Sequence, residues 1–383
     1  MANTNLANAK TAKNDEFYTQ YADIQKEMNA YLEYNPDVFR GKTILLPCDD
    51  PEWSNFTKFF AQNFEVFGIK KLISTSYAVE SKRIKEWRPT LFETESPFYD
   101  ADKSRTNGKI FILDQDINGD GRFNINDLHW SYLEGDGDFR SDEVKALRDE
   151  ADIVITNPPF SLFREFFSWI MEGQKQFVII GNINAVSYKE IFPYIKSGNV
   201  WLGATNFNTG MYFRVPEDFV YAASYKFDRE MNGEKVNRVP GCCWYTNIDH
   251  GRRHEPLPLM TMEDNIIYSK HKEVRGKQYV HYENFDAIEV PYYDAIPSDY
   301  DGLMGVPRSF LDKFCPDQFE IVGIDSTDFS EDLGIAPIGE EWIRKYKEAG
   351  GTGHMTANMR NLVLVVDGMP KISYARIIIR KKQ

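Results

Sequence analysis

Short apolar runs alternate with amphipathic segments along the first half of the chain. Five of these runs predict buried strands, at 43–47, 69–74, 109–113, 151–156 and 177–182. Three amphipathic segments between the runs predict helices, near 20–34, 53–66 and 162–173. Strands that alternate with helices indicate an α/β fold with a mostly parallel sheet, in which ligands bind beyond the carboxyl ends of the strands.

The pattern changes after residue 205. Strands are expected at 211–226 and 236–247, on either side of the hairpin signal Asn232-Gly233. From 251 onward, short apolar runs are separated by loops rich in Pro and Tyr. We therefore expect three parts: a flexible N-terminus (1–13), an α/β domain (14–250) and a second domain of short strands and loops (251–383).

Composition describes an ordinary globular protein. The chain has 383 residues, of which 42% are hydrophobic and 27% charged, so it can bury a substantial core. Its four Cys residues show neither disulfide nor zinc spacing, and the first twenty residues lack an apolar leader. We therefore expect a reduced, cytoplasmic setting. No apolar run is long enough to span a membrane.

The net charge of −13 is unusual for a protein that binds phosphates. The charge is unevenly distributed, because residues 114–143 hold nine acids and two bases and so supply −7 of the total. The last thirteen residues contain five bases and no acid. A basic face that binds nucleic acid therefore remains compatible with the sequence.

One tetrapeptide carries a specific chemistry: Asn157, Pro158, Pro159 and Phe160 follow the apolar strand 151–156. Proline removes backbone donors, and a residue before proline is held extended, so the Asn157 amide is fixed at the strand end. Its oxygen and the Pro158 carbonyl can accept hydrogen bonds from an exocyclic amine, while Phe160 can stack on an extruded base. The alternative is a plain proline turn that ends a strand.

These residues lie in a chain that resembles the EcoRI-type adenine-specific DNA methyltransferases over nearly its whole length. The resemblance is carried by "DEFYTQ" (15–20), "LPCDDPEWSNF" (46–56), "GDGDFRSDE" (135–143), "TNPPFSLFRE" (156–165), "CWYTNIDHGRR" (243–253), "IPSDYDGLMGVPRSFLDKF" (296–314) and "YARIIIRKK" (374–382). It implies a Rossmann-like S-adenosylmethionine-dependent methyltransferase fold with a C-terminal target-recognition domain. It also implies a monomeric enzyme that methylates adenine N6 in double-stranded DNA, within a system that includes a restriction endonuclease.

The resemblance assigns cofactor binding to three segments. The first closes over the methionine end of the cofactor, the second replaces the usual glycine-rich loop and meets the ammonium group, and the third holds the adenine. These residues are Phe17, Tyr18 and Thr19; Pro47, Cys48, and Asp49 or Asp50; and Asp138 with Phe139. Two simpler interpretations stay open: Asp50 as a helix N-cap, and "GDGDF" as a solvated turn. No acid follows the second strand, so no ribose ligand is assigned.

Residues 116–127 match the spacing of a calcium-binding loop. Oxygen ligands are expected at positions 1, 3, 5, 7, 9 and 12, with a glycine at position 6. These ligands are Asp116, Asn118, Asp120, the Arg122 carbonyl, Asn124 and Asp127. The loop resembles that of dockerin modules over these twelve residues only, and the alternative is a polar surface turn. A bound calcium ion would have a structural role.

Basic residues after 250 are candidates for contacts with DNA phosphates, and some Arg side chains for guanine edges. They are Arg252, Arg253, Lys270, Lys272, Arg275, Lys277, Arg376, Arg380, Lys381 and Lys382. Solvated surface positions are the alternative for many of them.

Two other functions fit parts of the sequence. One is methylation of another planar amine or amide, such as an RNA base, cytosine N4 or a glutamine side chain. The other is a non-catalytic DNA-binding or calcium-binding protein, against which the intact tetrapeptide argues. Recovery of labelled methyl groups in N6-methyladenosine distinguishes adenine methylation of DNA from both of these alternatives.

Overall fold

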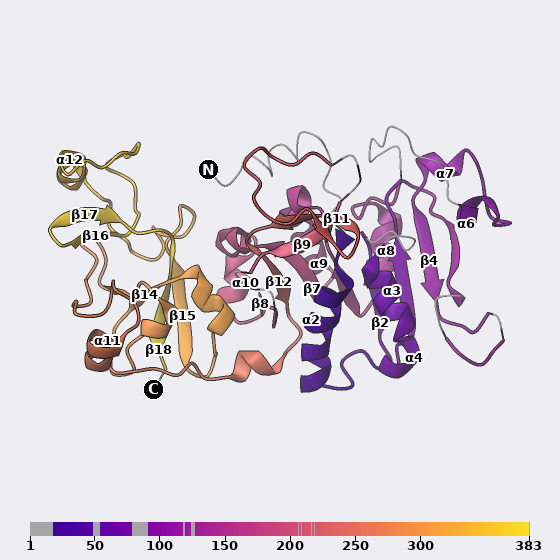
Figure 1. Ribbon diagram of the computed structural model, residues 1–383, viewed down its shortest axis with the longest axis horizontal. Coiled ribbons are helices and arrows are strands. Elements are labelled where there is room, and N and C mark those ends of the chain that lie inside the picture. Colours follow the sequence, from indigo (N-terminus) through magenta and orange to yellow (C-terminus); the bar gives the residue numbers. More distant parts are fainter. Residues whose placement is uncertain are drawn as a thin grey trace. The chain divides into compact units, whose positions relative to one another are not determined.

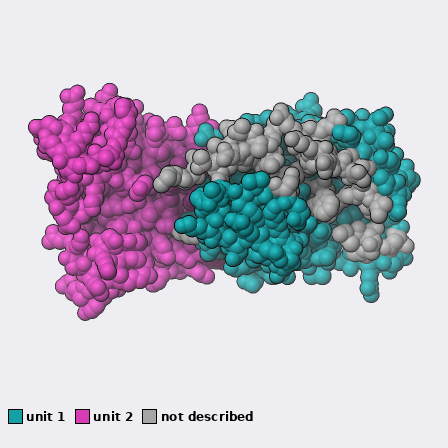
Figure 2. Space-filling model, turned by 45° about the horizontal axis from the view of Figure 1, so that its top comes forward, with its two compact units in different colours: residues 1–182, 202–250 teal, residues 183–201, 251–383 magenta. Residues whose placement is uncertain are grey.

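The computed structural model describes residues 18–48, 54–78, 91–117, 119–123, 127–205, 207, 209–215, 217 and 219–382. Five of the predicted site residues lie outside these ranges: Phe17, Asp49, Asp50, Asn118 and Asn124. The chain divides into unit 1 (1–182 and 202–250) and unit 2 (183–201 and 251–383), coloured separately in Figure 2. Residues 183–201 thus group with unit 2, although the sequence placed them within the α/β domain.

An eight-stranded mixed sheet forms the centre of unit 1 (Figure 1). Its order is β5-β4-β3-β2-β6-β7-β12-β8. The strands are β2 (Thr43–Leu46), β3 (Lys71–Thr75), β4 (Lys109–Leu113), β5 (His129–Tyr132), β6 (Ile153–Thr156), β7 (Gln176–Asn182), β8 (Trp201–Leu202) and β12 (Cys242–Thr246). The protein is therefore a mixed α/β protein, and the five strands predicted from apolar runs are confirmed to within two residues at each end.

The expectation of a mostly parallel sheet is wrong at its flanks. Strands β3, β2, β6 and β7 are parallel to one another, whereas β4, β5 and β12 pair antiparallel with their neighbours. Burial explains the difference: every residue of β2 and β6 is buried, while burial alternates along β4. The sequence of β4, "KIFIL", conceals this alternation because its half-exposed positions are also apolar.

Helices cover the sheet of unit 1. Those described are α2 (Tyr21–Tyr34), α3 (Asn55–Gln62), α4 (Phe64–Phe67), α6 (Leu91–Thr94), α7 (Lys103–Thr106), α8 (Asp142–Glu150) and α9 (Phe163–Glu172). Helix α2 buries Ile24, Met28 and Tyr31, as its apolar spacing requires. The N-cap of α3 is Ser54, whose hydroxyl accepts a hydrogen bond from the Phe56 amide at 3.1 Å. The cap of this helix is thus not Asp50, the residue suggested by the sequence.

A second, four-stranded sheet in unit 1 joins segments that are far apart in the chain. Its order is β1-β9-β11-β10, with β1 (Tyr18–Thr19), β9 (Met211–Arg214), β10 (Glu230–Met231) and β11 (Glu234–Val239). The predicted hairpin turn is confirmed, because Asn232 and Gly233 have φ values of 53° and 78° between β10 and β11. The long strands expected on either side are shorter than predicted.

Unit 2 consists of short strands, short helices and loops. A four-stranded sheet has the order β13-β14-β18-β15, and β16 pairs with β17. The elements are α10 (Phe192–Lys196), α11 (Met262–Tyr268), α12 (Glu340–Glu348), β13 (Ile288–Glu289), β14 (Met304–Pro307), β15 (Phe319–Ile324), β16 (Val363–Val366), β17 (Met369–Ile372) and β18 (Arg376–Lys381). Among the described residues of the chain, no helix is long and apolar enough to cross a membrane.

Candidate active site

The carboxyl ends of four parallel strands meet at one edge of the large sheet. Pro47 and Cys48 follow β2, and Asn157 follows β6. The Thr75 hydroxyl, at the end of β3, donates a hydrogen bond to the Pro47 carbonyl at 3.1 Å. Pro47 is buried and Cys48 half-buried, so the glycine-free segment after β2 is packed against the end of β3. The sequence predicted this edge as the binding edge.

The tetrapeptide links strand β6 to helix α9. Asn157 is half-buried, and its amide oxygen Oδ1 is buried from solvent. Pro158 is buried, and the Pro159 carbonyl accepts a hydrogen bond from the Leu162 amide at 2.9 Å. That bond closes a 3₁₀ turn over Phe160–Leu162, directly before α9. The Asn157 amide is thereby held between a buried strand and a helix start.

Strand β9 packs against this tetrapeptide. The Phe213 and Phe160 rings meet edge to face, with centroids 6.2 Å apart and an interplanar angle of 83°. Phe213 also pairs with Thr19 in the sheet, so β1 lies one strand away from the contact. The Asn55 side chain, at the start of α3, donates to the Thr19 carbonyl at 2.8 Å. The structure therefore brings together β1, the start of α3, Phe160 and β9.

Neither Asn55 nor Phe213 was singled out from the sequence. Asn55 belongs to the quoted string "LPCDDPEWSNF", and Phe213 lies in a predicted strand. Their importance depends on the two-residue pairing between β1 and β9, and no local sequence pattern predicts that pairing.

Two polar side-chain atoms of the β1 segment are buried and have no hydrogen-bond partner among the described residues. They are the Thr19 hydroxyl, in a residue 3% exposed, and the Gln20 amide nitrogen. A buried polar group without a partner costs about 1–3 kcal/mol, unless a ligand or water completes it. This feature fits a polar ligand beside β1.

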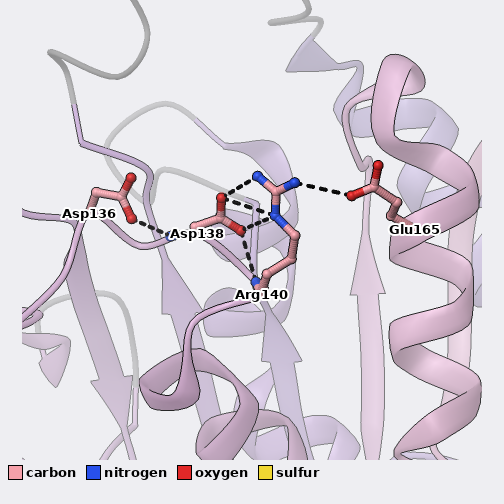
Figure 3. A network of polar contacts seen from close by, with 4 residues as sticks. All are labelled: Asp136, Asp138, Arg140 and Glu165. Carbon is pink, nitrogen blue, oxygen red and sulfur yellow. Dashed lines mark hydrogen bonds and ion pairs between the residues drawn. The ribbon is translucent and has the colours of Figure 1, made fainter.

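Asp138 belongs to a network of charges between the turn 135–138 and helix α9 (Figure 3). The Arg140 side chain donates from Nε to Oδ1 at 2.9 Å and from Nη2 to Oδ2 at 2.6 Å, and its Nη1 donates to Glu165 at 3.1 Å. Burial raises the pKa of Asp138, but hydrogen bonds from Arg140 and Tyr77 outweigh it and bring that pKa below its usual value. Asp138 is therefore a fixed, ionised acceptor.

Phe139 faces the protein interior. It is 5% exposed, and its ring meets the Phe166 and Trp169 rings of α9 edge to face, at centroid distances of 5.1 and 5.8 Å. The Arg140 guanidinium lies 5.5 Å from the centre of the same ring. Phe139 thus anchors the 135–138 turn on α9.

The 135–138 turn is also pressed against the end of β3. The Ala78 amide donates to the Asp136 carbonyl at 2.7 Å. Gly137 has a φ of +82°, and a Cβ atom there would lie 2.3 Å from the Ser76 carbonyl oxygen. Only glycine permits this approach, so Gly137 sets the position of the neighbouring Asp138.

Glu27, on α2, holds the segment that leads to β9. It is fully buried and accepts hydrogen bonds from the Tyr31 hydroxyl at 2.7 Å, the Ala204 amide at 2.8 Å and the Thr205 hydroxyl at 2.5 Å. Burial raises the pKa of Glu27, although these hydrogen bonds oppose the change. The sequence offered one signal for it, a lone acid between the apolar positions Ile24 and Met28.

Most of the basic residues predicted to meet DNA have partners inside unit 2. Arg252 pairs with Asp312 at 2.5 Å, and Arg253 stacks on the Trp201 ring at 3.7 Å. The other ion pairs are Lys270–Asp294, Lys277–Asp367, Arg376–Glu289, Arg380–Glu320 and Lys381–Asp301. Three of the predicted bases are exposed and form no ion pair with a described residue: Lys272, Arg275 and Lys382.

In the described part of the 116–127 loop, the acidic side chains accept hydrogen bonds from backbone amides of the same loop. Asp116 accepts from the Gly119 and Gly121 amides, both at 2.7 Å, and Asp120 accepts from the Arg122 amide at 2.8 Å. Asp127 is buried and accepts from the Ile117 amide. Within the described ranges, no group of three or more His, Cys, Asp or Glu side chains is placed to hold a metal ion. The calcium prediction therefore has no support there.

Comparisons with known proteins place the chain among DNA-modifying enzymes. A family model described as "Adenine-specific methyltransferase EcoRI" matches residues 5–382. The Type II methyltransferase M.EcoRI of Escherichia coli is 40% identical over 332 residues, which cover 85% of this chain and 91% of that protein. M.MpnI of Mycoplasma pneumoniae and M.MgeORF184P of Mycoplasma genitalium are each 35% identical over 315 residues, covering 82% of this chain and 83% and 84% of those proteins. No solved structure matches the chain.

Proposed function

The chain belongs to the EcoRI family of adenine-specific methyltransferases, and from this membership we propose that it methylates N6 of a specific adenine in double-stranded DNA. The observation that carries the proposal is the placement of Asn157 and Pro158. They lie at the carboxyl end of β6, where strand β9 covers Phe160. When bound, S-adenosylmethionine supplies an electrophilic methyl group.

Asn157 and Pro158 orient the amine. The Asn157 Oδ1 atom and the Pro158 carbonyl oxygen are two acceptors on a rigid turn, and an exocyclic amine has two hydrogens to donate. Two such bonds fix the nitrogen, so that its lone pair points away from both acceptors. Alignment of this kind is what a neutral amine needs most for attack on a methyl group. No ionisable base is required at this step.

The target adenine has to leave the double helix to reach Asn157, because N6 is paired in the duplex and the asparagine is half-buried. Phe160 offers a ring on which the extruded base stacks. Phe213 supports the Phe160 ring edge to face, which restrains its orientation. The half-buried position of Asn157 also limits the access of water to the amine.

We propose that the cofactor lies along the shared edge of the parallel strands, in a Rossmann-like arrangement. Tyr18, Thr19, Pro47 and Cys48 would hold its methionine end. The residues Phe17 and Asp49 or Asp50, which the sequence also assigned to the cofactor, lie outside the described residues. Asp138 accepts a hydrogen bond from the cofactor's 6-amino group, and Phe139 holds the Asp138 turn on α9.

We assign target recognition to unit 2, with Lys272, Arg275 and Lys382 as phosphate contacts, because these exposed bases form no ion pair with a described residue. We further propose that the enzyme acts in the cytoplasm as a monomer, alongside a cognate restriction endonuclease. Its relatives are Type II methyltransferases, which supports that context.

One assay tests the function itself. Unmethylated plasmid DNA is incubated with the protein and S-adenosylmethionine labelled in the methyl group, and the DNA is then digested to nucleosides. We expect the label in N6-methyl-2′-deoxyadenosine. Label in N4-methylcytosine, or transfer to RNA or protein but not to DNA, would contradict the proposal.

A further inference from the structure

A segment rich in aromatic side chains follows β9 and continues into β11. Its described residues 219–238 are referred to here as the aromatic loop, which includes β10 and the first part of β11. Three of its apolar side chains are exposed to solvent: Val220 (86%), Phe227 (45%) and Met231 (37%). Exposed apolar groups gathered on one short segment indicate a contact surface.

The two tyrosine rings of the aromatic loop, Tyr221 and Tyr225, are held in place by their hydroxyl groups. Tyr221 donates to the carbonyls of Val236 at 2.8 Å and Arg229 at 3.0 Å. Tyr225 donates to the Asp228 carbonyl at 2.8 Å and accepts from the Arg238 amide at 2.9 Å. The two rings lie 4.8 Å apart between centroids. A ligand that stacks here meets side chains already ordered, so binding loses little conformational entropy.

Cations lie against these rings. Arg229 is 4.9 Å and Lys235 5.6 Å from the Tyr221 ring centre, and Arg238 is 4.2 Å from that of Phe227. The loop holds four bases and three acids, a net charge of +1 in a chain of −13. Rings and guanidinium planes stack on unpaired bases, and cations attract phosphates, so this combination fits a single nucleic-acid strand.

The aromatic loop is continuous with the catalytic tetrapeptide. Strands β9 and β11 pair through Phe213 and Asn237, and the Phe213 ring packs on Phe160. A nucleotide next to an extruded adenine loses a stacking neighbour when that base leaves the duplex. Ordered aromatic rings on the segment that joins β9 to β11 can replace this lost stacking.

We propose that the aromatic loop binds the target-strand nucleotides that flank the extruded adenine, by stacking and by phosphate contacts. The proposal rests on the proposed function, because it requires an adenine that leaves the duplex at Asn157. It adds a DNA-binding surface on unit 1, separate from the bases of unit 2.

The test uses Val220→Asp and Phe227→Ala in the full-length protein. Val66→Asp is the matched control, because Val66 is 74% exposed on α4, which precedes the amino end of β3 and not its carboxyl end. The methylated site is first mapped by sequencing, and duplexes are made with 2-aminopurine at the target adenine. We expect the two loop variants to weaken duplex binding roughly 5- to 100-fold and to reduce the fluorescence rise on extrusion. Cofactor affinity and the thermal midpoint should not change, and Val66→Asp should behave as the wild type.

A second measurement identifies the nucleotides involved. An abasic site replaces each neighbour of the target adenine, and binding is compared between the wild type and Phe227→Ala. If the loop stacks on that neighbour, its removal weakens the wild type but costs the variant little. Equal losses in both proteins, or loop variants that bind DNA normally, would overturn this surface while leaving adenine methylation intact. A wild type that methylates no adenine overturns the proposed function, and this surface with it.

Discussion

The Arg140 guanidinium lies against both carboxylate oxygens of Asp138, with Nε 2.9 Å from Oδ1 and Nη2 2.6 Å from Oδ2. The Arg140 backbone amide adds a third bond, 2.8 Å from Oδ1. A residue two positions further along the chain thus fixes both the orientation and the charge of Asp138. Contacts within the protein therefore orient the aspartate that we assign to the cofactor's adenine.

Arg140→Gln should make cofactor binding sensitive to pH. Burial raises the pKa of Asp138, and Arg140 outweighs that effect in the wild type. Without the guanidinium the carboxyl protonates at a higher pH, and a protonated acid accepts the 6-amino hydrogen bond less well. We expect the variant's cofactor affinity to fall at a higher pH than that of the wild type, in titrations between pH 4.5 and 8. Arg344→Gln, an exposed position on α12, is the control; identical profiles for Arg140→Gln and wild type would refute the assignment.

Gly137→Ala should weaken cofactor binding by more than its cost in stability explains. The added Cβ would lie 2.3 Å from the Ser76 carbonyl, so the turn that carries Asp138 has to move. Gly368→Ala is a matched control, because Gly368 has a similar positive φ of +76° but nothing within 4 Å of its Cβ position. Both variants suffer backbone strain of roughly 1–2 kcal/mol. Cofactor affinity, measured by calorimetry, should fall only in Gly137→Ala; an equal fall in both would contradict the argument.

Glu27→Ala should strongly destabilise the protein. The change leaves the Ala204 amide and the hydroxyls of Thr205 and Tyr31 buried without their acceptor. Each lost partner costs about 1–3 kcal/mol, so urea unfolding should show a loss of several kcal/mol. Glu33→Ala, on an exposed position of the same helix, should change stability by less than about 0.5 kcal/mol. Similar unfolding curves for both variants would show that the Glu27 contacts do not hold this segment.

Asp325→Asn should gain stability relative to the wild type as the pH rises. Burial raises the pKa of Asp325 from 3.8 to about 6, so the native state favours the protonated acid. The stabilisation that the Asp325 carboxyl contributes to the wild type is fully present below pH 3.8 and is lost as the pH rises to about 6. The asparagine does not ionise, so its advantage should grow over that interval and then stay constant, at about 3 kcal/mol at most. Unfolding midpoints at pH 4, 5, 6 and 8 measure it, and a pH-independent difference would contradict the assigned cause.

Local sequence patterns predicted the parallel core of the sheet and the position of the tetrapeptide. Strands β2 and β6 are buried at every residue, so continuous apolar runs revealed them. The periodic apolar positions of α2 predicted both the helix and its buried face. The turn at Asn232 and Gly233 followed from the positive φ angles that these residues tolerate.

The remaining features depend on contacts between distant segments. The pairing of β1 with β9 places Phe213 beside Phe160, and only two residue pairs define it. The role of Arg140 depends on the rotamer that turns its side chain back to Asp138. Ion pairs such as Arg376 with Glu289 join residues that are far apart in the sequence, so the order of charges along the chain does not predict them. For this reason the sequence did not show that most bases predicted to bind DNA have internal partners.

Asn157→Ala, with separate measurements of methyl transfer and cofactor affinity, tests whether Asn157 orients the target amine. Asn63→Ala serves as the control, because Asn63 is also a half-buried asparagine of unit 1. It lies just before α4, which precedes the amino end of β3, whereas Asn157 follows the carboxyl end of β6. We expect Asn157→Ala to lose most transfer to adenine, roughly 100-fold or more, with an unchanged cofactor dissociation constant. A variant that still methylates adenine at the wild-type rate would contradict the account.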